Sequence, residues 1–343
     1  MFGFKEIVGH SDIIKHFKFS IKSNKISHAY LIVGEDDSGK MTLANAFAMA
    51  LQCENLDPNS DLEVIDSCGT CSSCKQFMSN NHPDIVYVTH DKSSIGVEDI
   101  RDQVNNDIVI KPYSSTFKIY IVDEAEKLTP QAQNALLKTL EEPPEYAIII
   151  LLSNNINRML DTIQSRCIIL QVKALDNNLV RDYLMSKHQI PDYQADLSAV
   201  FAQGNVGKAI KYASSEKFSE IKDTVLYLLK RIDKMENYEI IETVKDLGKE
   251  KDDVLNILDL ILLWYRDVLM YKVTKNLNLL LYKKERSYIS KGSKVISYEG
   301  IQNILKIIEE AKSKINANVS MDTTLQLMLF TIKENSNDWR NRS

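Results

Sequence analysis

Five short apolar runs in the first half of the chain constrain the fold more than any other feature. Their apolar residues are consecutive rather than alternating, and most are β-branched or aromatic. Such runs are typical of strands covered on both faces, which belong to parallel sheets flanked by helices. We therefore predict an α/β domain up to about residue 172, with strands at 29–34, 84–88, 118–123, 147–153 and 167–172.

The second half of the chain has a different pattern. All seven prolines lie at or before Pro191, and later segments have helical periodicity, such as the apolar stripe over 301–315. Within the first half, one helix is well delimited by Thr129 as its N-cap, Pro130 in its first turn and Pro143-Pro144 at its end. We predict a small helical domain over 173–213 and a larger one over 214–343.

Composition indicates a soluble globular protein, with 44% hydrophobic and 26% charged residues. The start of the chain does not have the pattern of a signal peptide, and the apolar segment 254–273 contains Asp259, Arg266 and Asp267. Three charges make this segment a core or interface helix rather than a membrane span. The net charge of −5 argues against binding of nucleic acid by the chain as a whole. We expect a cytoplasmic location.

Four of the five cysteines lie within 22 residues and end in the run CGTCSSC. Clustered cysteines in a cytosolic protein are more often metal ligands than disulfides, so we predict a structural zinc site. An iron–sulfur cluster and four separate structural thiols are the alternatives. The fifth, Cys167, begins an apolar run and is predicted to be a packed thiol. The predicted zinc ligands are Cys53, Cys68, Cys71 and Cys74.

The stretch GEDDSGKMT, residues 34–42, resembles a phosphate-binding loop between a strand and a helix. Gly34, Gly39 and Lys40 fit the pattern G-x-x-x-x-G-K-[ST]. Asp123-Glu124 ends a later strand, where nucleotidases place the acids that hold magnesium and polarise water. Together these features predict a nucleotidase-type fold, but they do not establish nucleotidase activity.

Two departures from the loop pattern affect its chemistry. Met41 replaces the hydroxyl residue that contacts magnesium, and Thr42, one place later, is expected to point about 100° away on a helix. Three acids, at 35–37, occupy the part of the loop that would surround phosphates. A carboxylate 5–6 Å from a phosphate charge repels it by about 3 kcal/mol before screening. We expect that the loop does not hold a nucleotide.

The stretch SNNINRMLDTIQSRCIIL (153–170), with HAYLIVG, DEAEKLTPQAQNALLKTLEEPP and the four cysteines, resembles bacterial clamp-loader subunits of the AAA+ class. The resemblance implies an AAA+ α/β domain over 1–172 with an inserted zinc module at about 53–80. It also implies a helical lid over 173–213 and a helical collar over 214–343, which holds subunits together. Segments 262–269 and 301–315 are then collar contacts or, alternatively, parts of a private core.

Site residues follow from the same resemblance. Ser165-Arg166-Cys167 matches the SRC motif, whose arginine reaches into the ATP site of the neighbouring subunit. Ser153-Asn154 matches the first sensor, and the cysteines match the zinc module. The remaining positions match the nucleotide site, which is degenerate here: Gly34, Gly39, Lys40, Asp123 and Glu124.

A further departure concerns the lid. ATP-hydrolysing members carry an arginine where this chain has Gly207 in GNVGKAI, and the adjacent Lys208 is expected to face elsewhere. The resemblance therefore implies a subunit that is no enzyme by itself, within the DNA polymerase III holoenzyme, a nucleotidyltransferase complex. The alternatives are an ATP-hydrolysing subunit with an unusual loop and a zinc-stabilised DNA-binding module. No Arg/Lys–aromatic cluster supports the latter.

The implied partners are the gamma/tau ATPase subunits and the delta subunit, in a ring of five subunits. Through this complex, the chain would act on the sliding clamp and on primer–template DNA in the replisome, with no membrane involved. Nothing in the sequence fixes the ring order.

Overall fold

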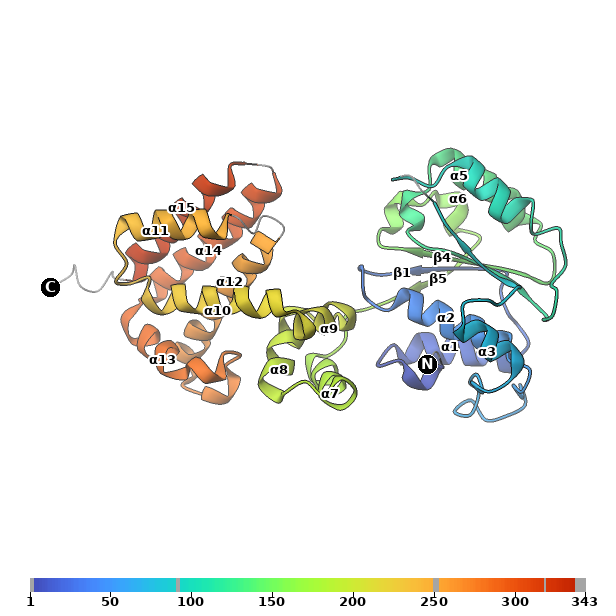
Figure 1. Cartoon of the computed structure of the whole chain (residues 1–343), viewed down its shortest axis with the longest axis horizontal. Coiled ribbons are helices and arrows are strands. Elements are labelled where there is room, and N and C mark those ends of the chain that lie inside the picture. Colours follow the sequence, from blue (N-terminus) through green and yellow to red (C-terminus); the bar gives the residue numbers. More distant parts are fainter. Residues whose placement is uncertain (1–2, 91–92, 249–252, 318, 337–343) are drawn as a thin grey trace. The chain divides into compact units, whose positions relative to one another are not determined.

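The computed structural model describes residues 3–90, 93–248, 253–317 and 319–336 (Figure 1). These residues form two compact units. The first unit comprises the described residues up to Tyr183 together with Gln203–Lys208, and the second comprises Leu184–Ala202 and the described residues from Ala209 onward. The finer division at about residues 172 and 213 stays a prediction.

A parallel sheet of five strands organises the first unit. The strands lie in the order β2-β3-β4-β1-β5, so β4 is central and β1 pairs with both β4 and β5. Leu31 of β1, for example, is in register with Leu151 and with Ile169. The predicted strand positions are confirmed within one residue at each end: β1 (Ala29–Val33), β2 (Ile85–Val88), β3 (Lys118–Val122), β4 (Ala147–Ser153) and β5 (Ile168–Gln171).

Helices cover both faces of this sheet, as consecutive apolar residues require. Successive side chains of a strand point to opposite faces, so Tyr30 and Ile32 join one core and Leu31 and Val33 join the other. The first core includes residues of α1 (Ser11–Lys22), α2 (Lys40–Leu51) and α3 (Ser72–Met78). The second includes residues of α4 (Val97–Ile100), α5 (Pro130–Glu141) and α6 (Asp161–Gln164), on the opposite side of the sheet in Figure 1.

Local signals explain the helix ends. The Thr129 hydroxyl accepts a hydrogen bond from the amide of Ala132, and Pro130 is the first residue of α5, which confirms the predicted cap. The expectation that every strand is covered on both faces is wrong for β5, where Ile169 is 42% exposed. The reason is that β5 is an edge strand, with β1 as its one partner in the sheet.

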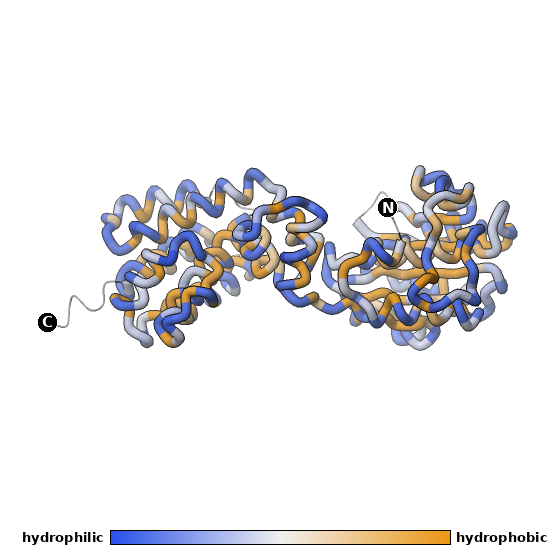
Figure 2. Tube along the Cα trace, turned by 90° about the horizontal axis from the view of Figure 1, so that it is seen from below, coloured by the Kyte–Doolittle hydropathy of each residue, from blue (hydrophilic) through white to orange (hydrophobic). Residues whose placement is uncertain are grey.

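Every regular element of the second unit is a helix within the described residues. α7 (Asn177–His188) and α9 (Val206–Ser214) each belong in part to both units. In Figure 2, the apolar residues of the helices lie mainly on the sides that face neighbouring helices. The other helices are α8 (Asp192–Phe201), α10 (Glu216–Arg231), α11 (Asn237–Leu247), α12 (Val254–Thr274), α13 (Arg286–Val295), α14 (Tyr298–Asn316) and α15 (Met321–Ser336).

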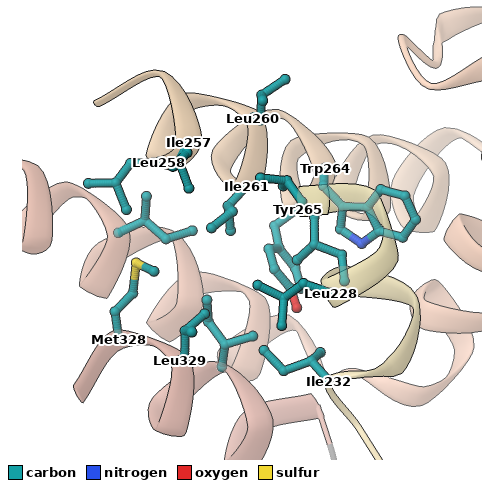
Figure 3. Close-up of a cluster of buried hydrophobic side chains, with 14 of the residues drawn as sticks. Leu228, Ile232, Ile257, Leu258, Leu260, Ile261, Trp264, Tyr265, Met328 and Leu329 are labelled. Atoms are coloured by element: carbon teal, nitrogen blue, oxygen red, sulfur yellow. The ribbon is translucent and has the colours of Figure 1, made fainter. Parts of the chain in front are cut away.

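The core of the second unit surrounds α12. Trp264 and Tyr265 pack there among aliphatic side chains of α10 and α15, such as Leu228 and Leu329 (Figure 3). The stripe of the predicted helix 301–315 faces the same core through Ile301, Ile304, Ile308 and Ala311. These residues close the unit's own core, whereas contacts with other subunits remain a prediction. No helix among the described residues is long and apolar enough to span a membrane.

Candidate functional site

The four clustered cysteines converge on one point. Their sulfur atoms all lie within 4.8 Å of one another, and the Sγ atoms of Cys68 and Cys74 are 3.9 Å apart. A disulfide requires about 2.05 Å, whereas Zn–S bonds of about 2.3 Å in a tetrahedron place sulfurs somewhat less than 4 Å apart. The four residues therefore fit a tetrahedral metal ion.

Backbone amides surround these sulfurs. The amides of Cys68, Cys71 and Cys74 donate to the sulfurs of Cys53, Cys68 and Cys71, respectively, over 3.3–3.4 Å. Burial opposes ionisation of the Cys68 thiol, but hydrogen bonds from the Thr70 hydroxyl and from nearby amides lower its pKa to about 5. At Cys68 these donors favour the thiolate, which is the form that binds metal, whereas burial raises the pKa of Cys53 and Cys74.

Cys167 takes no part in this cluster. It lies against the core on the α5 side of the sheet, and burial raises the pKa of its thiol to about 12. A thiol with such a pKa is protonated at neutral pH and behaves as a small apolar group.

A cavity of about 440 Å³ opens beside the phosphate-loop residues, at the carboxyl ends of the strands. Five of its lining residues are acids, and Lys40 is the one basic residue among them. Met41 and Thr42 both line the cavity, whereas the direction of the Thr42 side chain stays a prediction. The acids are Asp36, Asp37, Asp123, Glu124 and Glu126.

Lys40 is engaged within the loop itself. Its ammonium group donates to the carbonyl oxygens of Gly34 and Glu35, each over 2.7 Å, and the residue is only 8% exposed. The carboxylate of Asp36 lies 3.9 Å from the same ammonium. The lysine that would hold phosphates thus has its donors directed to the protein.

The loop acids bind residues from the sensor and lid positions. The Asn154 side chain donates to Asp36 over 3.1 Å, and Lys208 donates to Glu35 over 3.0 Å. The hydrogen bond from Lys208 is the main cause that lowers the pKa of Glu35. The prediction that Lys208 faces elsewhere is therefore wrong: at the start of α9 its long side chain reaches back to the loop.

Gly207 sits directly on the loop. Its amide donates to the carbonyl oxygen of Asp37 over 3.1 Å, and the side chain of Asn205 donates to the carbonyl of Asp36 over 2.8 Å. A Cβ atom at position 207 would lie 2.4 Å from the Asp37 oxygen. Any side chain at this position therefore requires the loop to move.

The two acids that follow β3, Asp123 and Glu124, lie in different environments. Burial raises the pKa of Asp123, so its charged form is disfavoured where a magnesium ligand must be ionised. Glu124 pairs with Lys127 over 2.6 Å and with His90 over 3.4 Å, and its pKa is lowered chiefly by the Lys127 hydrogen bond.

Arg166 does not line this cavity. It follows α6 and forms an ion pair of 2.6 Å with Glu141 at the end of α5, and it also donates to the carbonyl oxygen of Thr162. Ser165, beside it, accepts a weaker bond of 3.3 Å from the same guanidinium. The arginine side chain is 34% exposed, so it remains accessible at the surface.

Comparison with known proteins places these features in a family. Residues 9–176 match the family model described as DNA polymerase III, delta subunit. The chain is 28% identical over 325 residues to DNA polymerase III subunit delta' of Bacillus subtilis, covering 94% of this chain and 95% of that protein. The chain belongs to the clamp-loader family of DNA polymerase III.

A second relative, subunit tau, matches over a shorter share of its own length. The chain is 28% identical to subunit tau of Bacillus subtilis over 82% of this chain and 52% of tau. Among solved structures, a gamma subunit-related protein of Thermotoga maritima is similar with 20% identity and a TM-score of 0.47, covering 95% of this chain and all of that one.

Several residues at the site of this clamp-loader subunit were not predicted from sequence. Asn205 could have been noticed as an N-cap, since its side chain accepts from the amide of Lys208, but nothing in the sequence shows its bond to Asp36. Glu126 and Glu141 carry no sequence signal that separates them from neighbouring acids.

Proposed function

We propose that this clamp-loader subunit acts as the delta-prime subunit, a stator that does not hydrolyse ATP and supplies Arg166 to the ATP site of the adjacent subunit. The observation that carries the proposal is the cavity lined by five carboxylates, in which the one lysine is bonded to the loop. The similarity extends over 95% of a delta' protein but over only 52% of tau, which supports the same assignment.

The charge of the cavity opposes nucleotide binding. Each carboxylate within about 6 Å of a phosphate charge costs up to about 3 kcal/mol, and Lys40 would have to leave two carbonyl oxygens to compensate. A hard cation would also find the thioether of Met41 where a hydroxyl is needed. We therefore infer that this site binds no nucleotide with useful affinity.

Arg166 is suited to act on another chain. An arginine is permanently charged and can contact phosphate oxygens in a bidentate manner, and in trans it accelerates phosphoryl transfer by about 10³–10⁵. The Glu141 carboxylate holds the guanidinium at the surface, and a phosphate would replace that carboxylate on assembly. Ser165 adds one acceptor that limits rotation of the side chain.

The proposed setting is a ring of five subunits with gamma/tau ATPase subunits and delta, which loads the sliding clamp onto primer–template DNA. The helical second unit would serve as the collar that joins the subunits. Zinc, held by the four cysteines, would have a structural role, because a complete set of four protein ligands leaves no position for a substrate.

The decisive experiment is the DNA-stimulated ATPase of a reconstituted loader containing Arg166→Ala. We expect turnover at the adjacent site to fall by about 10³ or more. Arg166→Lys is the matched variant, since it keeps the positive charge and loses the bidentate guanidinium. It should show little more activity than Arg166→Ala. Unchanged turnover in a correctly assembled Arg166→Ala complex would exclude the finger assignment.

The second candidate is an ATP-hydrolysing subunit of the gamma/tau type. It is favoured by the presence of Lys40, Asp123 and Glu124 around a cavity of about 440 Å³. Titration of the isolated chain with Mg-ATP separates the two candidates. Micromolar binding that Lys40→Ala abolishes would support the ATPase, whereas no binding supports the stator.

A further inference from the structure

Residues 271–298 form a strongly basic segment in a chain that is acidic overall. The segment contains seven basic residues and one acid, Glu285, for a net charge of +6, whereas the whole chain carries −5. α13 within this segment contains no acid. The basic residues are Lys272, Lys275, Lys283, Lys284, Arg286, Lys291 and Lys294, all exposed except Lys272, which is half-buried.

Most of these cations have no acidic partner. Lys283 pairs with Asp196 over 2.6 Å, and Lys291 lies 3.7 Å from Asp233. Within the part of the chain that the structure describes, the other five form no ion pair. We call these five residues the basic surface: Lys272, Lys275, Lys284, Arg286 and Lys294.

Tyrosine rings lie beside these cations. The Lys284 ammonium is 3.4 Å from the ring centroid of Tyr193, and the Lys272 ammonium is 4.9 Å from that of Tyr298. Tyr193 and Tyr298 are 44% and 57% exposed. The expectation that the chain has no Arg/Lys–aromatic cluster is therefore wrong, because the fold pairs residues that are distant in sequence.

The two ends of the segment are joined. The Lys272 ammonium donates to the carbonyl oxygen of Ser293 over 2.7 Å while lying over the ring of Tyr298. This contact brings the end of α12 to the end of α13 and the start of α14. Lys294 and Tyr298 thus lie close to Lys272, so charge and aromatic surface are combined in one place.

We propose that the basic surface binds single-stranded nucleic acid. Unpaired lysines and an arginine neutralise phosphates, and an exposed tyrosine ring offers a face on which any unpaired base can stack. An acidic peptide would use the charges but would gain little from the rings, which is why the combination favours a nucleic acid. The inference does not depend on the stator role, since no residue of the basic surface lies in the first unit.

The test uses the full chain and a fluorescein-labelled oligothymidylate of about 30 nucleotides, with binding followed by anisotropy at about 50 mM salt. We expect the variant Lys275→Gln/Lys284→Gln/Arg286→Gln/Lys294→Gln to bind at least about tenfold more weakly, with a log–log salt slope reduced by roughly 3. Tyr298→Ala should also weaken binding by about fivefold or more, because stacking is lost.

A control variant carries the same charge change on the first unit: Lys15→Gln/Lys22→Gln/Lys25→Gln/Lys75→Gln, at four exposed positions. It should bind the oligonucleotide within about twofold of the wild type. Three results would overturn the proposal: no binding by the wild type, equal weakening in the control, or equal competition by poly-glutamate. The last would assign the basic surface to an acidic protein partner instead.

Discussion

The four-cysteine cluster and the phosphate loop are both sequence motifs of the first unit, yet their polar groups are directed in opposite ways. At the cysteines, backbone amides donate to the sulfurs of Cys53, Cys68 and Cys71, and the four sulfurs of the cluster are close enough to share one ion. At the loop, the Lys40 ammonium points back at loop carbonyls, and the acids bind Asn154 and Lys208.

The difference indicates that a motif can hold a ligand only when its ligand-binding groups are not already engaged by other groups of the protein. The cysteine cluster has four convergent ligands, and among the described residues no lysine or arginine bonds to them. The loop retains its Gly-Lys pattern, but Lys40 and two of its acids, Glu35 and Asp36, are engaged in internal contacts. We therefore propose that both motifs stabilise the fold, the first through a structural metal ion and the second without a ligand.

The largest expected effect comes from removing a cysteine. Cys74→Ser should abolish stoichiometric zinc and lower the free energy of unfolding by about 4 kcal/mol or more, since the metal contributes directly to folding. Elemental analysis and thermal denaturation measure both quantities. Cys167→Ser is the matched control and should retain one zinc per chain. Iron in place of zinc would contradict the assignment.

Substitution of Gly207 should be the next largest effect. In Gly207→Ala, the new Cβ meets the Asp37 oxygen, and the lost contacts should destabilise the protein by about 1–3 kcal/mol. Gly292→Ala in α13 is the control, because its Cβ would be 3.6 Å from the nearest atom and a helix favours alanine. Equal stability of the two variants in denaturant titrations would refute the close contact at 207.

Neutralising the loop acids tests whether charge closes the site. Asp36→Asn/Asp37→Asn keeps the side-chain shapes and should raise the affinity for Mg-ATP by about tenfold, because screened repulsion is removed. Asp12→Asn/Asp61→Asn makes the same charge change away from the cavity and should have no effect. Calorimetry of both variants measures the difference. An unchanged affinity for Mg-ATP would show that the hydrogen bonds of Lys40 alone prevent nucleotide binding.

The smallest effect is expected for the Glu35–Lys208 ion pair. Both side chains are substantially exposed, so Lys208→Ala should cost no more than about 1 kcal/mol and less at high salt. A double-mutant cycle with Glu35→Gln isolates the pair from other changes. A coupling above about 2 kcal/mol would mean that this pair, rather than the backbone bonds of Gly207, fixes the loop.

The sequence predicted what depends on local pattern. Strand positions followed from consecutive apolar residues, and the cysteine cluster followed from spacing, because metal ligands in one turn are close in sequence. The contacts of Lys208 and Asn205 were missed since they join residues 173 and 169 positions apart. The exposure of Ile169 and the pairing of Tyr193 with Lys284 likewise depend on the complete topology.

The close contact at Gly207 also limits how such a chain can change over many generations. An arginine cannot enter at 207 while the Asp37 carbonyl lies 2.4 Å from the position of its Cβ. A single substitution of this glycine by arginine would therefore destabilise the protein. A side chain at position 207 and the present loop conformation are therefore mutually exclusive, so a change of residue there requires a change of the loop.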